Sequence, residues 1–194
     1  QHLLRCESRV LRATSVTANE FAFAAPARAN GSALVIALSL SGGTPEVVAA
    51  AKKARELGAS VLAIVGKPSC ALAESADESI VFANEASGAE MDYEQSNIAV
   101  SLRIGFELLR LADGYGHYEK AALAFGVLDR SLRGMKKQIQ RRARKFGEEH
   151  KDDRFIYTVG SGPSFGAAQT LSVCIFMEME WIHSCAIHSG ELFH

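Results

Sequence analysis

The stretch SLSGGT at residues 39–44 concentrates groups that bind anions. Its hydroxyl-bearing and flexible residues are Ser39, Ser41, Gly42, Gly43 and Thr44. Hydroxyls donate hydrogen bonds, and glycines let the backbone approach a ligand closely. The stretch contains no lysine, whereas a nucleotide-binding P-loop ends in Lys followed by Ser or Thr. We therefore expect it to hold a sugar phosphate, with an ordinary polar turn as the alternative.

A second group that could do chemistry is Glu178, which lies in the apolar stretch IFMEMEWIH. An ionised carboxylate is costly to bury unless it is paired, so burial would raise its pKa and suit it to act as a general base. Glu180 is the rival, because on an α-helix the two side chains point roughly 200° apart and only one can face the core. A buried acid with a structural role fits the pattern equally well.

The loop GSGPSFG at residues 160–166 partly matches the GxGxxG fingerprint of dinucleotide-binding proteins but departs from it. Phe165 stands where the third glycine is needed, Pro163 stiffens the turn, and the expected acid is replaced by Glu180 on a helix. We expect no NAD and no other cofactor.

Three histidines near the end of the sequence raise the question of a metal: His183, His188 and His194. They form no HExxH motif, and they are expected to straddle a helix end, a short strand and a loop. We expect no metal site.

Charge and composition narrow the function classes. The 194 residues are 48% hydrophobic and 22% charged with a formal net charge of -1, which fits one globular domain or a pair of half-domains. The basic run from Arg133 to Lys145 is followed by Glu148 and Glu149, so we interpret it as a solvated helix face and expect no nucleic acid. No apolar stretch is long enough to span a membrane, and no leader is visible.

The four cysteines are Cys6, Cys70, Cys174 and Cys185. They form no CxxC pair and lie in or beside apolar stretches, which favours reduced, mostly packed thiols and a cytoplasmic location. The sequence starts at Gln1 and stops at His194 directly after Gly-Glu-Leu-Phe, so we expect a chain truncated at both ends.

The elements around SLSGGT are predicted as a parallel βαβ unit. Residues 33–39 form a buried strand, a helix runs from Pro45 to Leu57 with Gly58 closing it, and strands follow at 60–65 and 79–82. A ligand loop placed in this way lies at the carboxyl edge of the sheet, beside a helix N-terminus.

The second half is predicted to repeat that order. Helices fill residues 93–150 with breaks near Asp113-Gly114 and at Gly134, and a strand at 155–159 leads through the Gly/Ser loop into a helix at 167–183. The recurrence suggests two similar α/β halves.

Taken together, these residues resemble the SIS (sugar isomerase) domain family, which implies a flavodoxin-like, doubly wound parallel sheet with two such halves in tandem. SLSGGT matches the family's Ser-x-Ser-Gly-x-Thr phosphate loop. Glu178 and His194 stand sixteen positions apart and end in Gly-Glu-Leu-x-His, as do the catalytic pair in the isomerase half of glucosamine-6-phosphate synthases. The implied halves are residues 1–112 and 151–194, joined by a helical connector at 113–150.

Within the family, KDDRFIYTVGSG, CIFMEMEWIHSCAIHSGELFH and DGYGHY look most like stretches of bacterial deglycases that act on 6-phosphorylated Amadori compounds. The likeness implies Glu178 as base and His194 as acid, with no metal, in a homodimer whose partner supplies the histidine. Ser39, Ser41, Gly42 and Thr44 would hold the phosphate, and Ser161 and Glu191 are further candidate substrate contacts. The family's first strand, with its Cys-Gly-x-Ser loop, is not found in the sequence.

Three functions therefore compete. A deglycase that releases glucose 6-phosphate and a free amino acid comes first, and an aldose-ketose isomerase or synthase-type isomerase half comes second. A non-catalytic sugar-phosphate sensor is third. The amino acid carried by the sugar stays open, because the loop from Glu85 to Gln95 is expected to shape that pocket.

Overall fold

A computed structural model describes residues 1–84 and 91–193 of the chain. The chain divides into two compact units, the first made of Gln1 with Ser8–Ser131 and the second of His2–Glu7 with Leu132–His194. The part of the Glu85–Gln95 loop that spans residues 85–90 lies outside the described residues, as does His194.

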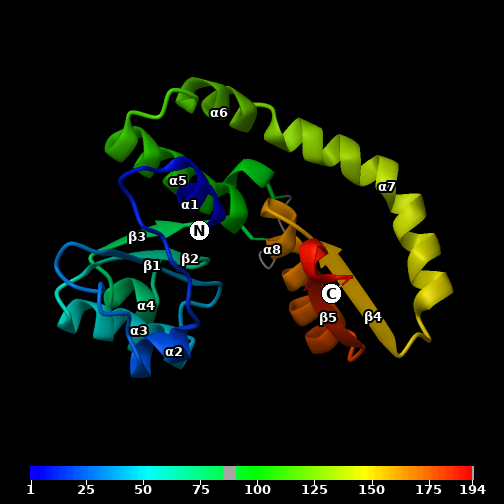
Figure 1. Cartoon of the computed structure of the whole chain (residues 1–194), viewed down its shortest axis with the longest axis horizontal. Helices are drawn as coiled ribbons and strands as arrows, with labels where there is room; N and C mark the ends of the chain where they lie inside the picture. Colours follow the sequence, from blue (N-terminus) through cyan, green and yellow to red (C-terminus); the bar gives the residue numbers. More distant parts are fainter. Residues whose placement is uncertain (85–90, 194) are drawn as a thin grey trace. The chain divides into compact units, whose positions relative to one another are not determined.

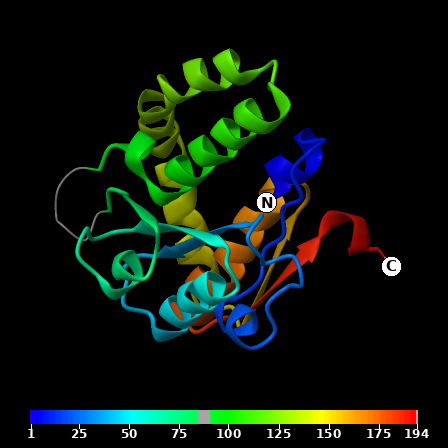
Figure 2. The ribbon, with the colours of Figure 1, turned by 90° about the vertical axis from the view of Figure 1, so that its left-hand side faces the viewer.

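The first unit is built on a parallel three-stranded sheet in the order β1-β2-β3. The strands are β1 (Leu34–Ser39), β2 (Ser60–Val65) and β3 (Glu78–Val81), with Leu34 opposite Ser60 and Leu62 opposite Glu78. Helices α2 (Ala18–Phe23) and α3 (Pro45–Glu56) lie on one face, and α5 (Asn97–Asp113) lies on the other (Figures 1 and 2). The predicted parallel βαβ unit is confirmed.

The main core of this unit lies between the sheet and α3. The helix contributes small residues, Ala51 and Ala54, which are fully buried and allow it to pack close to Val61 and Val65 of β2. Leu72 of the short helix α4 (Ala71–Glu74) closes one end of the cluster. This packing fixes the loop between β1 and α3 at the carboxyl edge of the sheet.

The prediction that residues 33–39 form a strand is confirmed, but the prediction that it is buried is wrong for one face. Leu34, Ile36 and Leu38 are 41–45% exposed, while the alternate residues Ala37 and Ser39 are buried. β1 is an edge strand of the sheet, and the described residues bury the side of β1 that carries Ala37 and Ser39 but leave the opposite side partly exposed.

The long helical region contains the helices α5, α6 (Tyr118–Phe125) and α7 (Leu128–His150). The predicted break after Asp113 is confirmed, because Gly114 adopts a left-handed φ of 61° and ends α5. The predicted break at Gly134 is wrong. A single glycine inside a helix costs only about 1 kcal/mol, and α7 runs through it.

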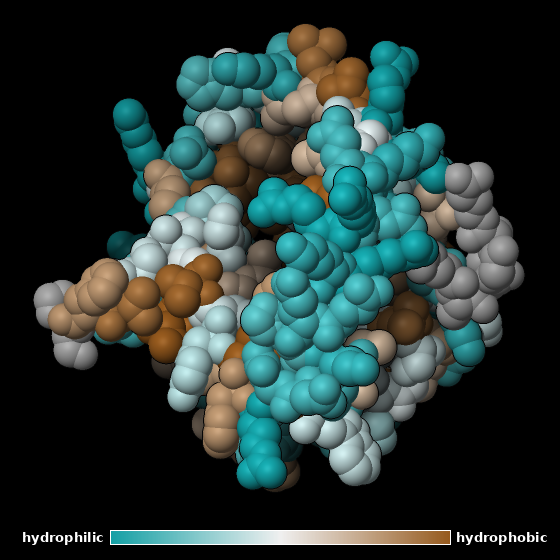
Figure 3. Space-filling view, turned by 90° about the vertical axis from the view of Figure 1, so that its right-hand side faces the viewer, coloured by the Kyte–Doolittle hydropathy of each residue, from teal (hydrophilic) through white to brown (hydrophobic). Residues whose placement is uncertain are grey.

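The basic run lies on α7, and its charged residues are exposed except for Arg133, which is partly buried. Figure 3, viewed from the side on which α7 lies in Figure 1, shows hydrophilic residues along this helix.

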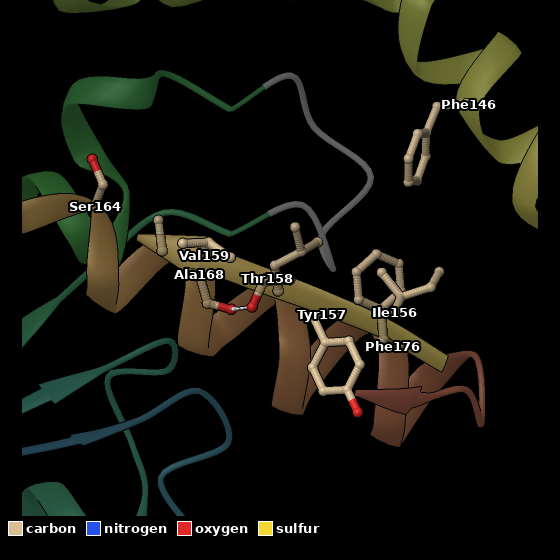
Figure 4. Close-up of a pocket in the computed structure, with 10 residues that line it drawn as sticks. Phe146, Ile156, Tyr157, Thr158, Val159, Ser164, Ala168 and Phe176 are labelled. Atoms are coloured by element: carbon tan, nitrogen blue, oxygen red, sulfur yellow. Dashed lines mark hydrogen bonds between the residues drawn. The ribbon is translucent and has the colours of Figure 1, made fainter. Parts of the chain in front are cut away.

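The second unit contains a parallel pair of strands, β4 (Phe155–Gly160) and β5 (His183–His188), joined through α8 (Pro163–Thr170) and a π-helix at Leu171–Met179. The Thr158 hydroxyl donates a hydrogen bond to the Ala168 carbonyl at 2.8 Å and ties α8 to the strand (Figure 4). The short helix α1 (His2–Glu7) also belongs to this unit, and 3₁₀ turns occur at Tyr93–Gln95 and Ser189–Glu191.

The predicted helix at 167–183 therefore has different limits and a different winding. It begins earlier, at Pro163, because proline is favoured at the first helical position. From Leu171 it widens to i→i+5 hydrogen bonds, and it ends at Met179, so that His183 opens a strand instead of closing a helix.

The cysteines are all free, but the prediction that they are mostly packed is wrong. Cys6, Cys174 and Cys185 are exposed, and only Cys70 is partly buried. Cys174 and Cys185 lie in the second unit, whose described residues contain a sheet of only two strands. Among the described residues, no helix is long and apolar enough to cross a membrane.

Candidate functional site: a phosphate loop at the edge of the first sheet

The loop between β1 and α3, residues 40–44, is called the phosphate loop after the family motif that SLSGGT resembles. Hydrogen bonds to the Ser39 side chain hold it in shape. This side chain is buried, and its Oγ accepts a hydrogen bond from the Gly42 N–H at 3.1 Å. The same Oγ lies 3.0 Å from the hydroxyl oxygen of Thr44. The last residue of the strand thereby links the middle and the end of the loop, which fixes the loop's shape before any ligand arrives.

Ser41 and Thr44 are the exposed hydroxyls of this loop. Ser41 Oγ accepts a hydrogen bond from the Gly43 N–H at 3.2 Å, which leaves its own proton available to a ligand. Thr44 occupies the N-cap position of α3, as the sequence indicates, but its side chain makes no capping hydrogen bond and faces Ser39 instead.

The N-terminus of α3 adds a backbone donor. The first-turn N–H groups of a helix have no partners inside it and carry partial positive charge. The helix is twelve residues long and starts with Pro45, which has no N–H. The Val47 N–H already donates to the Thr44 carbonyl at 3.1 Å, so Glu46 provides the first-turn N–H that has no partner in the described structure. This amide and the hydroxyls of the loop lie at the same helix end, an arrangement that favours an anion.

Gly42 lies at the centre of the loop with a φ of +65°, and it is buried. A Cβ added there would lie 2.2 Å from the Sγ of Cys70, which follows β2. The backbone also joins the two segments, because the Leu72 N–H donates to the Gly42 carbonyl at 2.9 Å. Only glycine satisfies both the backbone angle and the close contact at this position.

The segment Gly66–Cys70 is a part of the site that sequence reasoning missed. The signal was present, because it directly follows the strand at 60–65, and parallel neighbours end at the same edge of a sheet. The Gly66 N–H donates to the Leu40 carbonyl at 3.2 Å, which places this segment against the phosphate loop.

The second unit holds the other predicted site residues, which are Ser161, Glu178 and Glu191. Ser161 directly follows β4 and Glu191 ends the turn after β5. The last residues of these two strands, Gly160 and His188, are paired in register, so Ser161 and the turn that ends in Glu191 lie at one edge of the strand pair. His194, the predicted acid, lies outside the described residues.

The prediction that one of the two glutamates in IFMEMEWIH faces the core is wrong for the described chain. Glu178 and Glu180 are both exposed, and Ser172 is the buried residue of this π-helix. The apolar neighbours Met177 and Met179 are exposed as well, so the described residues leave this part of the segment uncovered on both sides. The described residues therefore build no apolar pocket around Glu178.

Two of the three histidines considered for a metal, His183 and His188, lie on β5. His183 opens the strand, and His188 ends it and accepts a hydrogen bond from the Gly190 N–H at 3.2 Å. The ring of Phe165 lies against that of His188 with centroids 5.4 Å apart. Across residues 1–84 and 91–193, no cluster of three metal-ligating side chains occurs.

A strand, a hydroxyl- and glycine-rich loop and a helix N-terminus in a parallel α/β sheet form the kind of edge at which such domains bind anionic ligands. Residues 10–89 match the family model of the SIS domain, so this region of the chain is similar to that family.

The similar proteins are deglycases and phosphosugar enzymes. Fructosamine deglycase FrlB of Bacillus subtilis (strain 168) is 37% identical over 97% of this chain and 56% of its own length. Fructoselysine 6-phosphate deglycase of Escherichia coli O157:H7 is 26% identical over 95% of this chain and 52% of its own length. The chain thus spans just over half the length of these curated relatives.

A solved structure is similar over the whole chain. The crystal structure from Salmonella typhimurium LT2 of a protein provisionally described as a phosphosugar isomerase superimposes with a TM-score of 0.96 at 40% identity, over 100% of this chain and 58% of that one. The α/β fold with parallel strands is therefore that of SIS phosphosugar proteins.

Proposed function

We propose that the protein is a deglycase that cleaves a fructose-amino acid 6-phosphate to glucose 6-phosphate and a free amino acid. The observation that carries the proposal is the phosphate loop, preorganised by Ser39, on a chain similar to enzymes named as deglycases. Residues 1–112 and 151–194 would belong to two SIS halves joined by the connector at 113–150.

The 6-phosphate would bind at the first unit. Ser41 and Thr44 would donate from exposed hydroxyls, Gly42 would allow close approach, and Ser39 would hold the loop in shape. The phosphate is remote from the bond that breaks, so its binding energy serves to orient C1 and C2 of the sugar.

The chemistry would be acid-base catalysis by Glu178 and His194. Glu178 removes a proton from C1, next to the C2 carbonyl, while His194 donates a proton to the carbonyl oxygen, which yields an enaminol. Return of a proton to C2 gives the imine between C1 and the amine nitrogen. Water then adds to C1, and the amino acid leaves with the nitrogen.

The base needs surroundings that the described residues do not supply, because Glu178 is exposed here. Our proposal is therefore that the pocket around Glu178 is completed in a cytoplasmic homodimer, with His194 supplied by the partner subunit. Ser161 and Glu191, at the neighbouring edge of the β4–β5 pair, would contact the sugar. No metal or cofactor takes part in these steps.

The second candidate is an aldose-ketose isomerase, because the same pair of groups can move a proton between C1 and C2 of a sugar phosphate. The similarity to a structure described provisionally as a phosphosugar isomerase favours it. A sugar-phosphate sensor would need the phosphate loop but not the base.

The test uses the full-length protein with 6-phosphofructose-aspartate and 6-phosphofructose-lysine in separate reactions, and a coupled dehydrogenase reports glucose 6-phosphate. The wild type should release glucose 6-phosphate, and the faster substrate identifies the amino acid. Glu178→Gln should abolish release while binding is kept, whereas Glu180→Gln serves as the matched control.

Release of glucose 6-phosphate that survives in Glu178→Gln would remove Glu178 from the mechanism. A wild type that binds fructose 6-phosphate but releases nothing from either conjugate would overturn the deglycase proposal. Conversion of fructose 6-phosphate to glucose 6-phosphate would then identify an isomerase, and binding alone would identify a sensor.

A further inference from the structure

Three successive loops meet at the carboxyl edge of the first sheet. The phosphate loop follows β1, the segment Gly66–Cys70 follows β2, and Asn84 lies just beyond β3. The Asn84 side-chain amide donates to the Gly66 carbonyl at 3.3 Å, and the Gly66 N–H donates to the Leu40 carbonyl. A Cβ on Gly66 would lie 2.6 Å from that Leu40 oxygen, so the contact requires glycine.

The segment Gly66–Cys70 is held directly against the centre of the phosphate loop. The Cys70 thiol packs against Gly42 and also donates a weak hydrogen bond to the Lys67 carbonyl at 3.5 Å. The backbone of Lys67 is thus tied to the residue that touches the loop. A lysine side chain is a flexible four-carbon stem with a charged end, so its ammonium group can move toward a ligand bound at the loop.

The charges along this edge are unequal. The phosphate loop carries no charged side chain, and Glu46 places a carboxylate in the first turn of α3. Among the described residues of the three loops, Lys67 is the one cation. Its side chain is exposed, and within residues 1–84 and 91–193 it forms no ion pair.

A phosphate monoester near neutral pH carries close to two negative charges. Hydroxyls and amides offset these charges only in part, and the carboxylate of Glu46 opposes them. A hydrogen bond from a charged donor is shorter and roughly twice as strong as one from a neutral donor. A phosphate bound at this loop would therefore be stabilised further by a positively charged side chain.

We propose that Lys67 supplies that charge and binds the phosphate group of the substrate from the strand next to the phosphate loop. The proposal rests on the proposed function, since it names a further binding residue of the same site. In a P-loop the lysine belongs to the loop itself. Here the segment after the neighbouring strand β2 provides it, and the Gly66 and Cys70 contacts keep its backbone in place.

The experiment measures binding of fructose 6-phosphate to the full-length protein by calorimetry at two ionic strengths. The variants are Lys67→Met, which keeps the length of the side chain without its charge, and Lys67→Arg, which keeps the charge. Lys52→Met is the matched control, because Lys52 is an exposed lysine on α3 that is not part of the three loops.

Lys67→Met should weaken binding about tenfold, the loss expected for one partly solvated charge-assisted hydrogen bond. It should also make the remaining affinity less sensitive to salt. Lys67→Arg should keep most of the affinity, and Lys52→Met should match the wild type. Thermal melting of each variant checks that the fold is unchanged.

Equal affinity of Lys67→Met and wild type for fructose 6-phosphate would overturn the inference and leave the proposed function standing. A loss confined to the amino acid conjugates would also overturn it, because the lysine would then contact the carboxylate. A wild type that binds no sugar phosphate at all would instead overturn the proposed function.

Discussion

The thiol of Cys70 and the α-carbon of Gly42 are in direct contact, although 28 positions separate them in the sequence. The contact joins the ends of two neighbouring parallel strands, and the hydrogen bond from the Leu72 N–H to the Gly42 carbonyl reinforces it. Two sets of contacts therefore hold the phosphate loop in shape: the hydrogen bonds of Ser39 and the contacts with the segment Gly66–Cys70.

Gly42→Ala is expected to destabilise the protein by about 2 kcal/mol. An alanine at a left-handed φ costs about 1 kcal/mol or more, and its Cβ would overlap the Cys70 thiol. Thermal melting should show a midpoint several degrees lower.

The matched control for this change is Gly43→Ala. Gly43 has no positive φ, and the atom nearest to an added Cβ is Ser41 Oγ at 4.0 Å. Its midpoint should stay close to that of the wild type. Equal midpoints for the two variants would show that the Gly42–Cys70 contact can relax without cost.

Ser39 and Thr44 are expected to differ in what they contribute, although both belong to the same motif. Ser39→Ala leaves the Gly42 N–H without its acceptor in a buried position, which costs about 1–3 kcal/mol of stability. It should also weaken sugar-phosphate binding, because the loop loses its brace. Thr44→Val removes an exposed hydroxyl and should reduce affinity with little change in the melting midpoint.

Ser32→Ala provides the comparison for both variants, since Ser32 is exposed, lies before β1 and bonds only to Asn30 in the described structure. It should change neither stability nor affinity. If Ser39→Ala keeps full stability but loses affinity for the sugar phosphate, then Ser39 contacts the ligand directly and does not act by holding the loop in shape.

The strands and the phosphate loop could be predicted because their signals are local. Residues 34–39 and 60–65 are apolar and rich in branched side chains, and glycines mark the loop and the end of α3. What covers each face is not a local property. The same pattern that predicts the strand at 34–39 cannot tell whether Ile36 is buried, and the structure leaves it exposed.

The surroundings of Glu178 could not be predicted for a related reason. Its apolar neighbours suggest burial, but Met177 and Met179 are themselves exposed, because the described residues do not cover this part of the π-helix. The contact between Cys70 and Gly42 depends on the register in which β1 and β2 pair. That register cannot be read from a single sequence before the fold is known. The sequence therefore predicts the SLSGGT motif, but it does not predict the contacts of other segments that hold this loop in shape.

The protein is expected to be more stable when Trp181 is replaced by glycine. It has a left-handed φ of 58° directly after the π-helix, where glycine is the usual residue, and its side chain is 88% exposed. Little buried surface is lost, so Trp181→Gly should gain about 1 kcal/mol and raise the melting midpoint by a few degrees.

Trp181→Ala separates the backbone from the ring, because alanine removes the indole but keeps the strain. It should leave the midpoint near that of the wild type. A gain as large with alanine as with glycine would mean that the exposed ring, and not the φ angle, sets the stability at this position.

Asp113 is expected to stabilise the first unit in a pH-dependent way. It lies at the carboxyl end of α5, where an acid opposes the helix dipole, yet it accepts three hydrogen bonds. The donors are the Ser8 hydroxyl at 2.5 Å and the backbone N–H groups of Arg9 at 2.8 Å and Val10 at 3.2 Å. The Ser8 hydroxyl, followed by the Arg9 N–H, lowers the pKa of this carboxyl below its ordinary value of 3.8.

A carboxyl whose pKa is lowered by folding stabilises the folded state above its unfolded pKa, and this contribution is lost as the pH falls through the folded pKa. Asp113→Asn should therefore melt at a lower temperature than the wild type at pH 7, and the two midpoints should converge as the pH drops below 3.8. Asp152→Asn, at an exposed aspartate of the second unit, should leave the midpoint unchanged at pH 7. A difference between Asp113→Asn and wild type that persists undiminished at low pH would mean that the hydrogen bonds act independently of the charge.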